Sequence, residues 1–87
     1  MVTVSYSKYF LSQSNKLPGP QQEKLAELLE LLSENPLHSK LHTKHLAGRL
    51  SGLYSFRITR DWRVIYQFVS PTEVQLMDVA HRKDIYR

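Results

Sequence analysis

With 87 residues, the chain has room for one domain, expected over residues 1–87, with one modest hydrophobic core. It contains no cysteine, which excludes disulfides, thiolate nucleophiles and cysteine-ligated metal centres. The formal charge of +4 is uneven, because residues 1–37 carry three lysines against four glutamates and residues 38–87 carry nine basic side chains against four acidic ones. Such a basic surface favours a nucleic acid or an acidic protein as partner, although a simply solvated surface gives the same composition.

The chain shows neither a long apolar run nor the basic start and apolar core of a signal peptide. The sequence therefore predicts a cytoplasmic protein that does not enter a membrane.

The first 37 residues predict one short strand and two helices. Residues 2–6 alternate apolar and small polar side chains, which is typical of a strand. Ser7 is placed to cap a helix that begins at Lys8. From residue 21 to residue 34, four leucines follow the i, i+3, i+4, i+7 spacing of an amphipathic helix, which Asn35 and Pro36 end.

Residues 37–52 form a basic connecting segment with little periodicity. Its histidines, His38, His42 and His45, have no cysteine or carboxylate among them to complete a metal site, so we expect neither a metal nor another cofactor. Lys44 and Arg49 in this segment are candidates for phosphate contacts.

Three further strands are predicted over residues 53–58, 62–69 and 73–80, joined by two short turns. The expected fold class is α+β. It combines a short N-terminal strand, a two-helix hairpin and a three-strand antiparallel meander in one twisted sheet, with the helices on one face.

Turn symmetry predicts which residues of these strands share a face. Symmetric turns place Arg57 opposite Arg63, and Arg63 opposite Val79. The core face then includes Asp78 as its one charged residue. The opposite face includes Ile65 and Met77, whose apolar side chains indicate that a partner covers it. The expected core face comprises Tyr54, Phe56, Ile58, Trp62, Val64, Tyr66, Phe68, Val74, Leu76, Asp78 and Ala80.

An arginine cluster is predicted at one end of the open face. Arg57 and Arg63 lie on paired strands, and the third strand returns Arg82 to the same end. Guanidinium groups match phosphate geometry and keep their charge near neutral pH. Arg60 and Lys83 add further phosphate contacts nearby.

Cleavage of RNA by its own 2′-hydroxyl needs a base, an acid and charge stabilisation. The arginines provide the charge stabilisation, and His81 is the one nearby group whose ordinary pKa suits proton transfer near neutrality. Tyr86 is placed to stack on or orient a nucleobase. A purely structural role for His81 or Tyr86 fits the same pattern.

The order of elements, together with three short motifs, resembles the RelE/ParE superfamily of bacterial toxins. The resemblance spans almost the whole chain, and its motifs are LSGLYSFRI at residues 50–58, DWRVIY at residues 61–66 and VAHRKDIYR at residues 79–87.

This resemblance implies a toxin of a type II toxin–antitoxin pair, neutralised by a cognate antitoxin. RelE-like members are metal-independent endoribonucleases that cut messenger RNA on the ribosome. The resemblance implies that Arg63 stabilises the transition-state phosphate, that Arg82 protonates or neutralises the leaving oxygen, and that Tyr86 orients the RNA. Arg57 occupies a position where the family has lysine or arginine. Because arginine does not lose its proton, His81 is the substitute base.

Two other functions stay open at this point. ParE-like relatives share the fold and inhibit DNA gyrase without nuclease chemistry. A toxin that has lost its activity would remain only as an antitoxin-binding protein.

Overall fold

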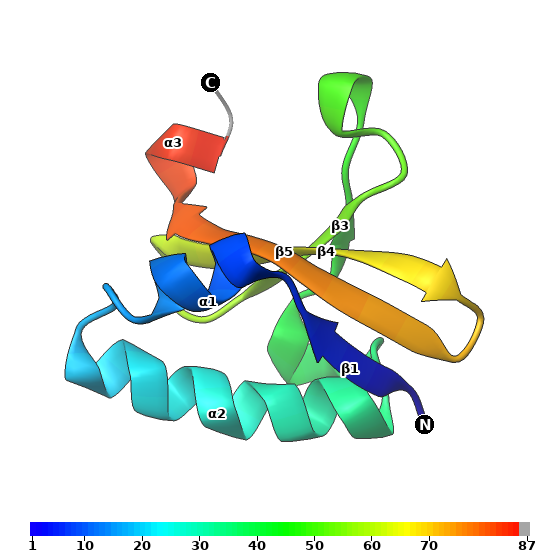
Figure 1. Ribbon diagram of the computed structural model, residues 1–87, viewed down its shortest axis with the longest axis horizontal. Coiled ribbons are helices and arrows are strands. Elements are labelled where there is room, and N and C mark those ends of the chain that lie inside the picture. Colours follow the sequence, from blue (N-terminus) through cyan, green and yellow to red (C-terminus); the bar gives the residue numbers. More distant parts are fainter. Residues whose placement is uncertain (86–87) are drawn as a thin grey trace.

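The computed structural model describes residues 1–85, which form one five-stranded mixed sheet with helices packed against it (Figure 1). The strand order is β1-β5-β4-β3-β2, with β1 parallel to β5 and the other pairs antiparallel. In chain order the elements are β1 (Thr3–Tyr6), α1 (Lys8–Ser14), α2 (Gly19–Glu34), the 3-10 helix η1 (Ser39–Leu41), β2 (Lys44–His45), the 3-10 helix η2 (Gly48–Leu50), β3 (Tyr54–Arg57), β4 (Trp62–Ser70), β5 (Glu73–His81) and α3 (Arg82–Ile85).

The predicted α+β fold is confirmed, and the sheet contains one more strand than predicted. Two residues of the basic connecting segment, Lys44 and His45, form β2 and pair with β3, which the sequence pattern did not predict. The histidines of this segment serve separate local contacts. His45 stacks on Tyr54, and Nδ1 of His38 accepts a hydrogen bond from the Lys40 N–H at 3.1 Å.

Ser7 joins the first helix to the sheet. Its hydroxyl accepts the Phe10 N–H at 3.0 Å as the predicted cap of α1, and it donates to the Met77 carbonyl oxygen of β5 at 3.2 Å. The apolar stripe of α2 buries Leu25, Leu28 and Leu32 as expected. Both helices therefore contribute to one core, which also contains Phe10, Phe56, Val64, Tyr66, Val74, Leu76 and Val79.

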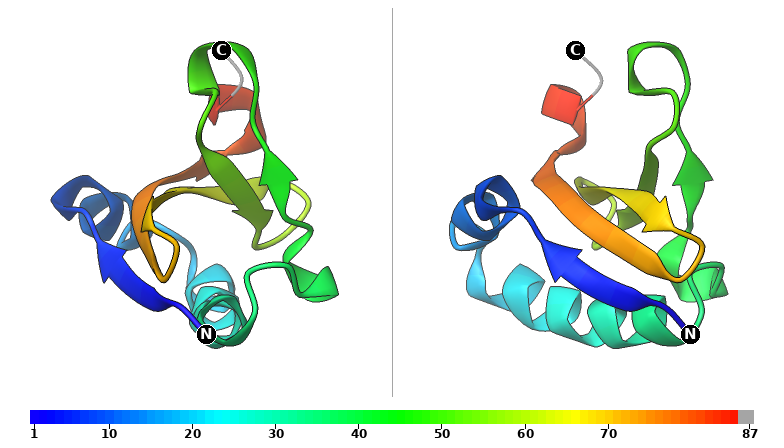
Figure 2. Two further views of the ribbon diagram at one scale, coloured as in Figure 1. Left: turned by 90° about the vertical axis from the view of Figure 1, so that its right-hand side faces the viewer. Right: turned by 45° about the vertical axis from the view of Figure 1, so that its right-hand side comes forward.

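The face of the sheet that points away from the main core, here the second face, is partly covered by the chain itself. While α2 runs along one side of the sheet, α3 and residues 46–53 rise on the other (Figures 1 and 2). On this second side Leu46, Ser55 and Ile65 are buried outside the main core. The expectation that Ile65 is left open for a partner is therefore wrong.

A bulge in β5 changes the expected faces. Ile65 is paired with Asp78 and Tyr66 with Leu76, so Met77 is an extra residue without a partner on β4. Because side chains alternate along a strand, one extra residue exchanges the two faces beyond it. Val79 thus enters the core, Asp78 lies opposite Ile65 on the second face, and Arg63 is paired with Ala80. The predictions that Asp78 and Ala80 face the core and that Arg63 lies opposite Val79 are wrong.

Candidate functional site

Arg57 and Arg63 are directly opposed on β3 and β4, as the sequence predicts. Both residues are partly buried on the second face of the sheet. Like charges at opposed positions destabilise a sheet. In addition, Nε of Arg63 is buried and has no hydrogen-bond partner within residues 1–85. This pair would be stabilised by an anion, and a phosphate group offers enough oxygens to contact both guanidinium groups.

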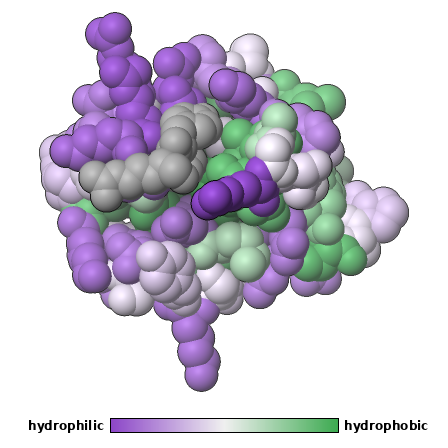
Figure 3. Space-filling view, turned by 90° about the horizontal axis from the view of Figure 1, so that it is seen from above, coloured by the Kyte–Doolittle hydropathy of each residue, from purple (hydrophilic) through white to green (hydrophobic). Residues whose placement is uncertain are grey.

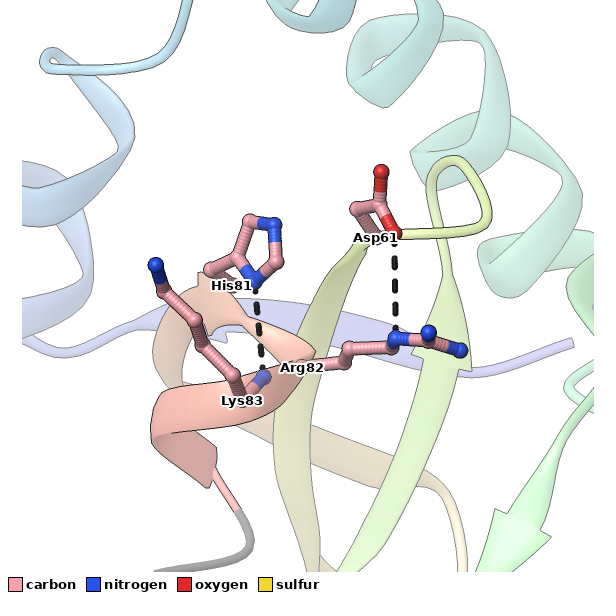
Figure 4. A network of polar contacts seen from close by, with 4 residues as sticks. All are labelled: Asp61, His81, Arg82 and Lys83. Atoms are coloured by element: carbon pink, nitrogen blue, oxygen red, sulfur yellow. Dashed lines mark hydrogen bonds and ion pairs between the residues drawn. The ribbon is translucent and has the colours of Figure 1, made fainter.

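Arg82 is held at the same end of the sheet by Asp61, which directly precedes β4 (Figure 4). The Arg82 N–H donates to the Asp61 carbonyl oxygen at 2.6 Å, and Arg82 Nε lies 3.7 Å from Asp61 Oδ1. Both side chains are about half exposed, at 52% and 51%. The backbone bond fixes where α3 begins, while the exposed guanidinium can exchange its carboxylate partner for a phosphate.

We expect Asp61→Asn to change the free energy of unfolding by less than about 1 kcal/mol, because an exposed ion pair contributes little and the backbone hydrogen bond is retained. Urea denaturation of the wild type and the variant measures this difference. A loss of several kcal/mol would show that the Asp61 carboxylate, and not the backbone, holds α3 in place.

His81 lies on the other side of the sheet from the arginine pair. It is paired with Trp62, whose indole is part of the helix-side core, and the two rings meet edge to face at 5.4 Å. Nδ1 of His81 accepts the Lys83 N–H at 3.4 Å (Figure 4). The ring also borders a surface hollow formed with Leu17 and other residues of the α1 side. The register thus separates His81 from the arginines that it was expected to serve.

The remaining basic candidates come from four different segments of the chain. Lys44 is paired with Ser55 and so shares the face of Arg57, two residues along β3. The other three are exposed and lie on η2, in the β3–β4 turn and on α3: Arg49, Arg60 and Lys83. Tyr86 lies outside the described residues. Seen from the side of α3 and residues 46–53, the surface is largely hydrophilic, with apolar side chains in smaller patches (Figure 3).

Asp78 is the residue of this face that sequence reasoning missed. It lies two residues before Ala80, which is paired with Arg63. Burial raises the pKa of the Asp78 carboxyl, and a hydrogen bond from the Val79 N–H opposes this shift in part. Strand alternation alone places Asp78 in the core, and the misplaced charge in an otherwise apolar face was the one signal of an irregular register.

The mixed sheet with a parallel N-terminal strand, the helical hairpin on one side and the arginine pair on the other are consistent with the resemblance to the RelE/ParE superfamily of toxins. Residues 4–86 match the family described as the ParE toxin of the type II toxin–antitoxin system parDE. The chain belongs to this family, and it is a type II toxin of the RelE/ParE superfamily. No curated protein sequence shows a significant match.

Solved structures support the same fold. YafQ from Escherichia coli strain BL21(DE3) is 19% identical, with a TM-score of 0.80 and 100% of both chains covered. RelBE2, a toxin–antitoxin complex from Mycobacterium tuberculosis, contains a chain that is 28% identical, with a TM-score of 0.77, 93% of this chain and 98% of that chain covered. The archaeal RelE–RelB complex from Pyrococcus horikoshii OT3 contains a chain that is 23% identical, with a TM-score of 0.76, 93% of this chain and 94% of that chain covered.

Helices that are long and apolar enough to cross a membrane are absent from the part of the chain that the structure describes.

Proposed function

We propose that this toxin is a metal-independent endoribonuclease that cleaves messenger RNA on the ribosome and acts in the cytoplasm. The observation that carries the proposal is the opposed Arg57 and Arg63 pair, in which the buried Nε of Arg63 has no hydrogen-bond partner among residues 1–85. Two adjacent guanidinium groups without a carboxylate between them suit a phosphodiester whose negative charge increases during cleavage.

The proposed roles follow from position on the sheet. Arg63 and Arg57 bind the scissile phosphate, and Arg82, at the same end, neutralises the leaving oxygen. Lys44, which shares the face of Arg57, and the exposed cations Arg49, Arg60 and Lys83 are proposed to bind neighbouring phosphates of the same strand. The role of Tyr86 in orienting the RNA stays a proposal based on family resemblance.

A second candidate function is inhibition of DNA gyrase without nuclease activity. The observation that favours it is the family match itself, which is to ParE. A positive surface also suits an acidic protein partner. The Arg63 Nε, which has no partner in the described part of the chain, favours the nuclease, because binding to a protein surface does not require two opposed, partly buried arginines.

A parallel assay of the purified toxin separates the two functions. One reaction contains ribosomes programmed with a defined messenger RNA, whose ends are mapped by primer extension. The other contains gyrase and relaxed plasmid. We expect new RNA ends and normal supercoiling. Intact RNA with blocked supercoiling would establish the gyrase function, and no effect in either reaction would indicate an inactive antitoxin-binding protein.

We also propose that a cognate antitoxin neutralises the toxin. RelBE2 from Mycobacterium tuberculosis is described as a toxin–antitoxin complex, and Staphylococcus aureus YoeB is described in complex with YefM. On the side of β1 and α1, Tyr6 and Leu11 are about half exposed and border the same surface hollow, so they are a candidate contact for an apolar partner. Co-expression with the cognate antitoxin is expected to relieve growth arrest.

A further inference from the structure

The proposed cleavage lacks a proton acceptor among the residues expected from the sequence. Arginine does not give up its proton near neutral pH, and His81 lies on the helix side of the sheet. A base must reach the 2′-hydroxyl next to the phosphate that Arg63 binds. Such a base has to lie on the second face of the sheet, near Arg63.

Asp78 is a carboxylate in this position. Through the bulge at Met77 it lies opposite Ile65, and Arg63 lies opposite Ala80, so Asp78 and Arg63 are diagonal neighbours on adjacent strands. Diagonal neighbours in an antiparallel pair are roughly 7–8 Å apart at Cα. Side chains that extend from such positions can contact the two ends of one ribose phosphate unit, its 2′-hydroxyl and its phosphate oxygens.

Asp78 is also a partly buried carboxylate. Burial raises the pKa of its carboxyl and the Val79 N–H lowers it, and no lysine, arginine or histidine within residues 1–85 contributes to this shift. The other charged side chains that the strands place on this face are Arg63, Arg57 and Lys44, on β4, β3 and β2, and Glu73 at the far end of β5, while η2 and α3 on the same side carry Arg49 and Arg82. Burial of an unpaired carboxylate is unfavourable, and groups of this kind are concentrated at functional sites.

We infer that Asp78 is the general base of the cleavage reaction, an inference that rests on the proposed nuclease function. The ionised carboxylate accepts the 2′-hydroxyl proton as the 2′-oxygen forms its bond to phosphorus. The bond between phosphorus and the 5′-oxygen breaks, and the 5′-oxygen takes a proton from water. Protonated Asp78 then neutralises the hydroxide formed. The products are a 2′,3′-cyclic phosphate and a 5′-hydroxyl end.

The raised pKa of Asp78 supports this role, because a base accepts a proton better as its pKa approaches the working pH. The same shift in pKa predicts how the stability of the fold depends on pH. Since the folded state binds this proton more tightly than the unfolded state, stability falls as pH rises from the ordinary pKa of 3.8 through the raised pKa. Near neutral pH, Asp78→Asn is therefore expected to be at least as stable as the wild type. This advantage should disappear below pH 3.8.

The test compares Asp78→Asn with Glu73→Gln, which removes the same charge from the other end of β5. Single-turnover cleavage of ribosome-bound messenger RNA is measured from about pH 3.8 to about pH 8, and thermal unfolding is recorded for each protein. We expect Asp78→Asn to lose about 10²–10⁴-fold in rate at neutral pH without loss of melting temperature, and Glu73→Gln to cleave like the wild type. The wild-type rate should rise with pH through the pKa of Asp78.

Two results would overturn the inference in different ways. If the wild type cuts RNA and the cleavage rate of Asp78→Asn is within about threefold of the wild-type rate, Asp78 is not the base, and the proposed nuclease function still holds. Wild type that leaves ribosome-bound RNA intact overturns the nuclease function and the role of Asp78 together. If Asp78→Asn does not fold, a wild-type rate that stays flat from about pH 3.8 to about pH 8 still excludes Asp78 as the base, because a carboxyl whose pKa is raised above 3.8 is more than half protonated at the start of this range.

Discussion

Arg63→Ala is expected to lower the rate of messenger RNA cleavage by about 10²–10³-fold, because it removes a preorganised charge from the phosphate at the transition state. Arg63 is directly opposed to Arg57, so the loss also relieves repulsion between like charges on paired strands. The side chain lies outside the main core. The melting temperature should therefore stay the same or rise while activity is lost. Single-turnover cleavage and thermal unfolding of the same preparation measure both effects.

The matched control for this prediction is Lys24→Ala. It also removes one positive charge, but Lys24 is an exposed residue of α2, on the helix side of the sheet. A general electrostatic effect on binding to the ribosome would lower the activity of both variants alike. If Arg63→Ala cleaves as fast as Lys24→Ala, the arginine pair is not the phosphate site.

Phe56→Ala is expected to destabilise the fold by about 3–5 kcal/mol, because it opens a cavity in the centre of the core. Phe56 lies on β3, is fully buried and has its ring 6.1 Å from that of Tyr66. Small domains have a total stability of about 5–15 kcal/mol, so this loss is a large part of the whole. Urea denaturation followed by circular dichroism measures it as a lower midpoint.

Val69→Ala is the control for Phe56→Ala. Val69 lies on β4 and is 48% exposed, so its truncation should change stability by no more than about 0.5 kcal/mol. A similar loss in both variants would mean that stability depends on strand propensity and not on the packed core that joins α2 to the sheet.

Local patterns were sufficient for most of the fold. The leucine spacing of α2 and the cap at Ser7 predicted both helices, because helix periodicity and capping depend on residues a few positions apart. The short turn between β3 and β4 likewise placed Arg57 opposite Arg63, since turn length sets the register of a hairpin. Strand β2 was missed because two residues are too few for a periodic pattern.

The candidate site was predicted only in part, for reasons that lie in the tertiary structure. The sequence by itself determined the toxin fold and the arginine pair. Contacts between distant segments decided the rest: the bulge at Met77 moved Asp78 out of the core and onto the face of Arg63, and pairing with Trp62 placed His81 on the opposite side. A single extra residue in one strand reverses every side chain beyond it, and only the pairing with a neighbouring strand reveals that residue.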